Sequence, residues 1–489
     1  TTTGTTAFPE LDSLPRGTNL WRGFLNWAGG LGIIVVAMIF LPVMKVGGMQ
    51  FFKSEGFDTL GKILPRAFDI AGEMTAVYCG ITALCTLCYL FLGMDGYDAL
   101  VLAMSTCSTG GFAQYDASFG GFIGPLEYVA SFFMILASIP FIRMVQMVRG
   151  TPGPMWRDVQ IRAYLRWTFY AIAVIVLYRL IWLKADNPLD VIRETVFNVV
   201  STFSGTGYAS TDVTQWGHLS FAVLIVVGLI GGCTGSTSCS VKVFRYLVLF
   251  QAIKAQLRRM QSPHRVFPLK YDGRPLDHDV VDSVMAFFTL FMLSFGVLIV
   301  GLALTGLHPR TALTGAWTAI ANIGPVWGPE ISANGSIHEF PTSAKWLMIL
   351  GMYIGRLELL SVFVLHVPIA GNFFVLILVS LLFIFVSLSL GLLISTVTQN
   401  QIAAMLVSGL VLLMPTTLMS GMIFPIDAMS VPLQAISSIL PARWYIEIVR
   451  KVMIQGVNVV FVLKEIAILV LMAFVLIMIS LKKFKIRLE

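Results

Sequence analysis

Charged residues are scarce in this sequence, and their scarcity excludes a water-soluble protein. Only 12% of the 489 residues are Asp, Glu, Lys or Arg, and 57% are hydrophobic. An ordinary soluble domain has about 25% charged and about 45–50% apolar residues, so a soluble core of the present composition would lack its polar shell. The sequence contains instead about ten apolar stretches, each near the roughly twenty residues that cross a bilayer as a helix. These stretches predict an all-α polytopic membrane protein.

Cysteine is also sparse, and its placement indicates no metal site. The six cysteines lie in or beside apolar stretches, where we expect small buried side chains (Cys79, Cys85, Cys88, Cys107, Cys233 and Cys239). The pair Cys85 and Cys88 lacks the second pair of ligands that a zinc site needs. The net charge of +7 comes from Lys and Arg in short loops, which indicate membrane orientation and not a nucleic-acid partner. We therefore predict no cofactor and no nucleic-acid binding.

The apolar stretches follow a repeated order of a full span, a half-span and a second full span. Three copies of this order are present (74–94, 97–106 and 121–144; 167–183, 189–203 and 218–250; 284–304, 310–321 and 343–365). A span at 26–44 precedes them, and the basic loop after it is expected in the cytoplasm. The polar residues Thr1–Thr6 are not the charged and then apolar start that predicts a signal peptide. We expect residues 1–66 to be a truncated first copy.

Each copy carries a short polar segment with glycine. The segments read STGGF at 108–112, SGTGY at 204–208 and NIGP at 322–325, and TTTGTT opens the chain at 1–6. With Gly4, Gly110, Gly207 and Gly324 taken as equivalent, the separations are 106, 97 and 117 residues, a near-constant period. Non-helical backbone at membrane depth is tolerated where it lines an ion path, and four such segments can surround one axis with their carbonyl oxygens. The alternative is that these glycines pack helices or form turns.

Residues 1–366 contain six distinctive motifs. They read WAGGLGII at 27–34, VGGMQ at 46–50, STGGF at 108–112, TGYAS at 206–210, NIGP at 322–325 and GRLEL at 355–359. Together they resemble the Trk/Ktr/HKT superfamily of potassium transporters, and most closely its TrkH branch. The resemblance implies potassium uptake through four membrane–pore–membrane units at 1–66, 67–160, 161–275 and 276–366. It implies a filter for the potassium ion at Thr3, Gly4, Thr109, Gly110, Gly111, Thr206, Gly207, Asn322, Ile323 and Gly324.

The resemblance also implies partners and a location. We expect a homodimer in the lipid of a bacterial inner (cytoplasmic) membrane, with a ring of cytosolic nucleotide-binding regulatory subunits on its basic loops. A glycine at all four filter positions looks like the potassium-selective pattern, since sodium-preferring relatives replace the first with serine.

The apolar stretch at 218–250 is too long for one span. The sequence GGCTGSTSCS at 231–240 interrupts it with residues that weaken a helix, so we predict a break in mid-membrane. A phosphate loop is excluded because the Walker lysine is missing. In the resembling family this stretch gates permeation below the filter, and a buried arginine adds a barrier to cations. The gate residues so implied are Gly231, Gly232, Gly235, Lys242 and Arg356.

Two simpler interpretations of this region stay open. The loop could be a packing kink, and Arg356, which lies well inside a span, could form a structural ion pair with Glu358. Outer acidic residues could concentrate cations at a mouth or be solvated loop charge (Asp98, Asp116, Asp186, Asp190, Asp212 and Glu330). For Asp277, His278 and Asp279 we expect helix capping rather than a metal site.

The composition changes after Leu365. Residues 373–395, 402–424 and 461–481 are dense apolar spans without a filter-like segment. The motifs HVPIAG at 366–371, SGMIFP at 420–425 and LPARWY at 440–445 resemble the last spans of type-2 ABC transporter permeases. If the span of Arg356 ends in the cytoplasm, three further spans place the basic tail outside, against the positive-inside rule. We interpret residues 367–489 as an ABC-2-permease-like segment joined to an unrelated membrane protein by fusion or misassembly.

Three functions can be ranked from these patterns. The first is a potassium uptake pore without covalent chemistry, which the repeated filter segments favour. The alternative is a permease subunit of an ABC-type exporter, which would need a cytosolic ATPase partner. An enzyme comes last, because among residues inside spans only Arg356 and Glu358 qualify for catalysis.

Overall fold

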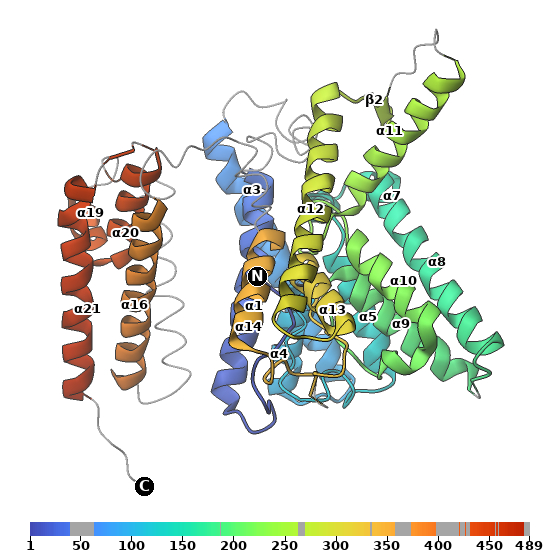
Figure 1. Cartoon of the computed structure of the whole chain (residues 1–489), viewed down its shortest axis with the longest axis horizontal. Helices are drawn as coiled ribbons and strands as arrows, with labels where there is room; N and C mark the ends of the chain where they lie inside the picture. Colours follow the sequence, from blue (N-terminus) through green and yellow to red (C-terminus); the bar gives the residue numbers. More distant parts are fainter. Residues whose placement is uncertain are drawn as a thin grey trace. The chain divides into compact units, whose positions relative to one another are not determined.

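The chain forms two compact units, Thr1–Leu365 and His366–Glu489 (Figure 1). The computed structural model describes residues 1–39, 63–185, 187–262, 269–332, 335–356, 373–397, 420, 426, 431–454, 456–457 and 459–483. The boundary between the units falls where the composition of the sequence changes. Asp186, Glu358 and the motifs at 46–50 and 366–371 lie outside the described residues.

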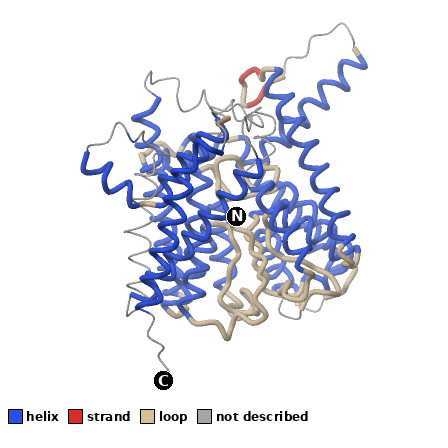
Figure 2. Tube along the Cα trace, turned by 60° about the vertical axis from the view of Figure 1, so that its left-hand side comes forward, coloured by secondary structure: helices blue, strands red, loops and turns tan. Residues whose placement is uncertain are grey.

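Helix dominates both units, as Figure 2 shows. Among the described residues the only sheet is an antiparallel pair of two-residue strands, β1 (Lys270–Tyr271) and β2 (Arg274–Pro275). Five helices of the described chain are long and apolar enough to cross a membrane (Gly72–Phe91, Val159–Ile181, Val213–Ile230, His278–Leu304 and Leu463–Ser480). The prediction of an all-α polytopic membrane protein is confirmed.

The first unit repeats an order of three successive helices, of which the middle one corresponds to a predicted half-span. Its helices are α1 (Arg16–Ile39), α3 (Ile63–Phe91), α4 (Gly96–Cys107), α5 (Pro125–Ala137), α6 (Phe141–Val148), α7 (Gly153–Arg157), α8 (Val159–Ile181), α9 (Pro188–Ser204), η1 (Val213–Trp216), α10 (Gly217–Ile230), α11 (Val243–Gln261), α12 (His278–Leu304), α13 (Pro309–Ala321) and α14 (Thr342–Arg356). The predicted half-spans are α4, α9 and α13, and each packs between its two neighbours in the chain. We call α4, α9 and α13 the pore helices.

Local sequence explains why the pore helices begin where they do. The Asp95 carboxylate precedes α4 and accepts a hydrogen bond from the Tyr97 N–H at 3.3 Å. Pro188 and Pro309 open α9 and α13, where a residue without an N–H is tolerated and its backbone angle already fits a helix. A capping residue or a proline therefore fixes the N-terminal end of each of the three helices.

One predicted span is not continuous. Residues 121–144 were expected to cross the membrane as a single helix, but α5 and α6 meet at a bend of 98°. Pro140 stands at the start of α6, and its ring and missing N–H prevent α5 from continuing. The prediction of one span here is wrong, and the break exposes backbone groups that the site uses.

The second unit is a small helical bundle. Its described elements are α16 (Phe373–Val397), α19 (Val431–Ile439), α20 (Pro441–Val449), η4 (Arg450–Ile454), η5 (Val459–Val462) and α21 (Leu463–Lys483). Helix α16 packs against α20 and α21, with Val386 and Leu469 in the core. The Phe383 and Tyr445 rings stack at 4.3 Å. The spans predicted at 373–395 and 461–481 correspond to α16 and α21, and the one at 402–424 lies outside the described residues.

Candidate ion pathway

A residue with positive φ follows each pore helix within two residues of its end. These residues are Thr109 (φ 49°), Gly205 (φ 80°) and Asn322 (φ 54°), and Thr2 (φ 55°) takes the same conformation near the start of the chain. A left-handed residue stops a helix and turns the chain away from its axis. Each of the four polar segments therefore begins with the same kind of turn in the backbone.

The shared backbone pattern corrects the register of the predicted glycines. Two residues after the left-handed position come Gly4, Gly111, Gly207 and Gly324, and the last three have φ of 70°, 78° and 130°. The equivalent glycine of the second copy is thus Gly111, not Gly110. The sequence pair Gly110 and Gly111 offered two choices, and only the backbone angles distinguish them.

The four segments close on one another in chain order. A Cβ built on Gly4 would lie 3.2 Å from the Gly110 carbonyl oxygen, and one on Gly111 would lie 1.9 Å from the Thr206 oxygen. A Cβ on Gly207 would lie 2.0 Å from the Ile323 oxygen, and one on Gly324 would lie 2.8 Å from the Gly4 Cα. Each glycine therefore faces backbone of the next segment, and the fourth segment meets the first. We call this arrangement the glycine ring.

Side chains link the segments of the ring. The Thr3 hydroxyl and the Asn322 amide lie 2.6 Å apart, and the Thr5 hydroxyl donates to the Gly324 carbonyl at 2.7 Å. In the amide orientation that satisfies both of its atoms, Asn322 also accepts the backbone N–H of Arg356 at 3.2 Å. The first and fourth segments are thus held together and to the end of α14.

Asn26 of α1 was not identified from the sequence, although it packs directly on the ring. A Cβ on Gly110 would lie 2.3 Å from the Asn26 amide nitrogen, so the close packing itself requires glycine at position 110. The amide donates to the Ser105 hydroxyl of α4 at 3.3 Å. A lone buried asparagine in an apolar span is the signal that could have identified it.

The predicted break between α10 and α11 is a compact loop at 231–242, which we call the gate loop. Every residue of this loop is buried. Gly231 and Gly235 have positive φ, and a Cβ on Gly232 would lie 2.5 Å from the Ser238 hydroxyl. Lys242 is buried at the end of the loop, where its backbone N–H donates to the Ile230 carbonyl at 2.8 Å. Small residues are therefore needed for the loop to fold back on itself.

The structure brings Arg356 and the gate loop together. The guanidinium Nη1 donates to the Thr237 carbonyl at 3.1 Å and contacts Cys239 Sγ. Arg356 is 6% exposed, and its Nη2 has no hydrogen-bond partner among the described residues. Thr2, beside the glycine ring, lies 3.9 Å from Cys239 through its hydroxyl. The positively charged guanidinium of Arg356 therefore lies between the ring segments and the gate loop.

The break between α5 and α6 receives the gate loop, a contact that sequence reasoning missed. The Cys233 N–H donates to the Ser138 carbonyl at 3.0 Å, and the Phe141 N–H donates to the Gly235 carbonyl at 2.9 Å. The Thr237 hydroxyl donates to the Ala137 carbonyl at 3.0 Å. The groups freed by the helix break thus bind the loop, and Pro140 was the signal that could have revealed them.

The described acidic residues that were expected on the outer side are engaged in local contacts. Asp98 is buried and accepts from Gln114 at 2.8 Å and from the Tyr115 hydroxyl at 3.0 Å, so it is not solvated loop charge. Asp116 accepts the Leu11 N–H at 2.9 Å. Asp277 stands at the N-cap position of α12 with extended backbone angles, and Asp279 lies in the first turn, although the Asp277 side chain makes no capping hydrogen bond there. No cluster of metal-ligating residues occurs in the described part of the chain.

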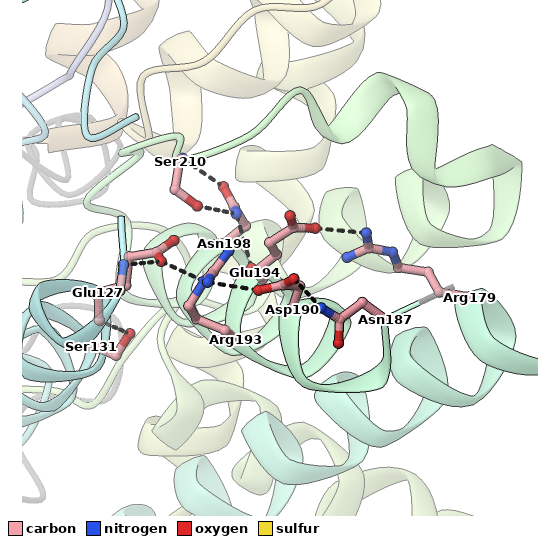
Figure 3. A network of polar contacts seen from close by, with 10 residues as sticks. Glu127, Ser131, Arg179, Asn187, Asp190, Arg193, Glu194, Asn198 and Ser210 are labelled. Atoms are coloured by element: carbon pink, nitrogen blue, oxygen red, sulfur yellow. Dashed lines mark hydrogen bonds and ion pairs between the residues drawn. The ribbon is translucent and has the colours of Figure 1, made fainter. Parts of the chain in front are cut away.

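Pore helix α9 is held by ion pairs on two sides (Figure 3). Arg193 pairs with Glu127 of α5 at 2.8 Å and with Asp190 at 2.7 Å. Arg179 of α8 pairs with Glu194 at 2.7 Å. The Arg179 guanidinium also lies 4.2 Å from the centre of the Trp216 ring. We call these five charged residues the ion-pair chain.

Glu330 ties the segment after the fourth glycine to the start of α13. Its carboxylate accepts the His308 N–H at 2.7 Å and also the Thr311 hydroxyl. Slight burial alone would raise the pKa of Glu330, but these hydrogen bonds outweigh burial and lower the pKa below its usual value. The carboxylate thus stays ionised where an isolated one would begin to take up a proton.

We expect Glu330→Gln to lower the melting temperature at neutral pH but not in acid. Because the folded-state pKa is lowered, the ionised carboxylate stabilises the fold fully above the ordinary pKa of 4.5, and this stabilisation is lost as the pH falls through the lowered value. Thermal unfolding of variant and parent from pH 7 to pH 3 measures the difference, with exposed Glu10→Gln as control. A difference that is constant over this range would contradict the role of Glu330.

The glycine ring, its short pore helices and the gate loop define a multi-pass membrane protein of the pore-helix transport class. A family model, TrkH, described as a cation transport protein, matches residues 1–376. The chain belongs to the TrkH family. A second family model, described as an ABC-2 type transporter membrane segment, matches residues 348–454, which confirms the resemblance expected near the C-terminus.

Curated relatives and a solved structure agree with this membership. The chain is 39% identical over 370 residues to the Trk system potassium uptake protein TrkI of Halomonas elongata, covering 75% of each chain. It is 32% identical over 377 residues to the TrkH protein of Vibrio parahaemolyticus, covering 75% of this chain and 76% of that protein. The crystal structure of the potassium transporter TrkH from Vibrio parahaemolyticus matches with a TM-score of 0.67 and 29% identity, covering 75% of each chain.

Proposed function

We propose that this chain takes up potassium ions across a cell membrane through the glycine ring. The observation that carries the proposal is the closure of the four segments around one ring, with each glycine against backbone of the next segment. Curated relatives at 32–39% identity are named potassium uptake proteins of the Trk system, which supports the choice of potassium as substrate.

The filter in this proposal consists of the residues from the left-handed position to the glycine in each segment. Carbonyl oxygens there replace the hydration shell of the ion, so the pathway needs neither a cofactor nor covalent chemistry. All of the predicted filter residues lie within these bounds (Thr3, Gly4, Thr109, Gly110, Gly111, Thr206, Gly207, Asn322, Ile323 and Gly324). Gly110 also packs against Asn26.

The gate in this proposal consists of the gate loop and Arg356. A guanidinium close below the ring raises the energy of a potassium ion by charge repulsion. The loop hydrogen bonds to the break between α5 and α6, so its movement would open the path without unfolding a span. Lys242, at the loop's end, adds a second positive charge.

We further propose a dimer in a bacterial inner membrane, regulated by a cytosolic nucleotide-binding subunit. The term Trk system in the names of the relatives supports regulatory partners. The basic residues Lys254, Arg258 and Arg259 at the end of α11 are mostly exposed and offer positive charge to such a subunit.

Uptake in a bacterial strain without potassium transporters of its own tests the proposal. We expect the chain to restore growth at low potassium and to accumulate rubidium tracer, with excess potassium competing and excess sodium not. A membrane-inserted chain that accumulates no rubidium above the vector control would refute the proposed function.

A further inference from the structure

We propose that Asn198 is a positioning residue that sets ion specificity by fixing the outer end of the third filter segment. The inference rests on the potassium pathway proposed above. Asn198 lies on pore helix α9, and it acts through Ser210, three residues beyond Gly207 in the chain. Figure 3 shows its side chain directed at Ser210, beside the ion-pair chain.

Asn198 and Ser210 bond to each other in both directions. The Asn198 amide nitrogen donates to the Ser210 hydroxyl at 3.0 Å, and the amide oxygen accepts the Ser210 N–H at 3.3 Å. The amide nitrogen also donates to the Glu194 carbonyl of its own helix at 2.9 Å. Asn198 is 2% exposed, so water cannot reach these polar groups, and removing one partner leaves the other without a hydrogen bond. We call the pair Asn198 and Ser210 the outer clamp.

The helix that carries the outer clamp is itself immobilised. Arg193 of α9 binds Glu127 of the preceding repeat. Glu194 of α9 is bound by Arg179, which lies on α8 of the same repeat. Glu127 is 1% exposed, so one carboxylate of the contact is almost fully removed from water. Breaking a buried ion pair on one side is costly, which makes α9 a rigid support.

Further hydrogen bonds to α9 restrain the chain at the last filter residue and directly after it. The Gly207 N–H donates to the Ser201 carbonyl at 3.1 Å, and the Ser201 hydroxyl donates to the Tyr208 carbonyl at 2.8 Å. At the outer end the clamp holds Ser210. A filter that fits potassium must keep its oxygens from closing around the smaller sodium ion, and slack at one end allows that closure.

The other two pore helices perform the same task with different residues. In the second repeat, Asp98 of α4 accepts from Gln114 and from Tyr115, three and four residues beyond Gly111. In the fourth, Thr314 of α13 donates to the Trp327 carbonyl at 2.8 Å and accepts the Trp327 N–H at 3.1 Å. Three unrelated polar side chains thus restrain equivalent places, which indicates that restraint, rather than the amide group itself, is what each repeat requires.

The test compares Asn198→Ala and Ser210→Ala with the parent chain. Both variants remove the hydroxyl–amide bond, and only the first also removes the bond to the Ser210 N–H. Ser131→Ala is the matched control, because Ser131 is equally buried and donates to the Glu127 carbonyl at 2.7 Å without reaching the filter segment. Rubidium uptake is measured against sodium competition and normalised to folded protein.

We expect the preference for potassium over sodium to fall about tenfold in Asn198→Ala and less in Ser210→Ala. Ser131→Ala should keep the parent's preference. A purely structural role would lower uptake of both ions in proportion to folded protein and leave their ratio unchanged, which would overturn the proposal. If Asn198→Ala does not fold, a potassium-over-sodium preference in Ser210→Ala equal to that of the parent is sufficient to overturn the proposal.

The two proposals fail in different ways. If the parent chain shows no potassium-selective uptake, the proposed function fails whatever the variants do. If the parent is selective and both folded variants match it, only the outer clamp fails. A second readout is the difference in melting temperature between potassium and sodium buffers, which we expect to narrow in the clamp variants and to persist in Ser131→Ala.

Discussion

Replacing Gly207 by serine is expected to lower the preference for potassium over sodium by about a hundredfold. The new Cβ would lie 2.0 Å from the Ile323 carbonyl oxygen, so the backbone would have to move by about 1 Å to reach even the closest contact that Cβ atoms make. The positive φ of 78° adds strain for any residue with a side chain. Both effects displace the oxygen atoms that would surround the ion.

Gly121 provides the matched control for this substitution. It is exposed, a Cβ there meets nothing within 4 Å, and its φ lies outside the positive range, so Gly121→Ser should leave uptake unchanged. Rubidium uptake with and without sodium, per folded protein, is the measurement. Equal sodium exclusion in Gly207→Ser and the parent would show that the glycine ring is not the filter.

Replacing Arg356 by alanine is expected to raise basal cation flux by one to two orders of magnitude. A unit charge about 6 Å from an ion, at an effective dielectric constant of about 20, repels it by about 3 kcal/mol, which corresponds to roughly a hundredfold in rate. Screening and relaxation of the loop reduce this value. The substitution also removes the hydrogen bond to the Thr237 carbonyl, which loosens the gate loop in the same direction.

Arg356→Lys separates charge from hydrogen bonding. Lysine keeps the positive charge but lacks the guanidinium whose Nη1 contacts both the Thr237 carbonyl and Cys239 Sγ, so we expect a flux between those of the parent and the alanine variant. Liposome flux per folded protein is the measurement. A folded alanine variant that is no leakier than the parent would leave Arg356 a structural role only.

The repeats of the first unit could be predicted from the sequence because their signals are local. Proline at the first helical position, a cap before α4 and a polar glycine segment after each half-span all act within a few residues. The break at 231–240 was predictable for the same reason, since helix-weakening residues gather there. Each of these features was visible without knowledge of any distant contact.

Other features depend on contacts between distant residues. The choice between Gly110 and Gly111 rests on backbone angles set by packing against Asn26 and Thr206. Asp98 was assigned to the outer side by topology, but Gln114 and Tyr115 bury it. Asn198 is one of several polar residues in the half-span at 189–203, and its contact with Ser210 forms only in the folded chain, so the sequence does not distinguish it.

The four segments of the glycine ring belong to one polypeptide, and this has a genetic consequence. In a pore built from four identical subunits, one altered codon changes every quarter at once. Here each quarter is encoded separately, so a mutation reaches one quarter and leaves three intact. With the glycine ring as the proposed filter, ion preference can change in small inherited steps, and engineered alleles that alter one, two or three quarters should give a graded series rather than a single transition from active to inactive.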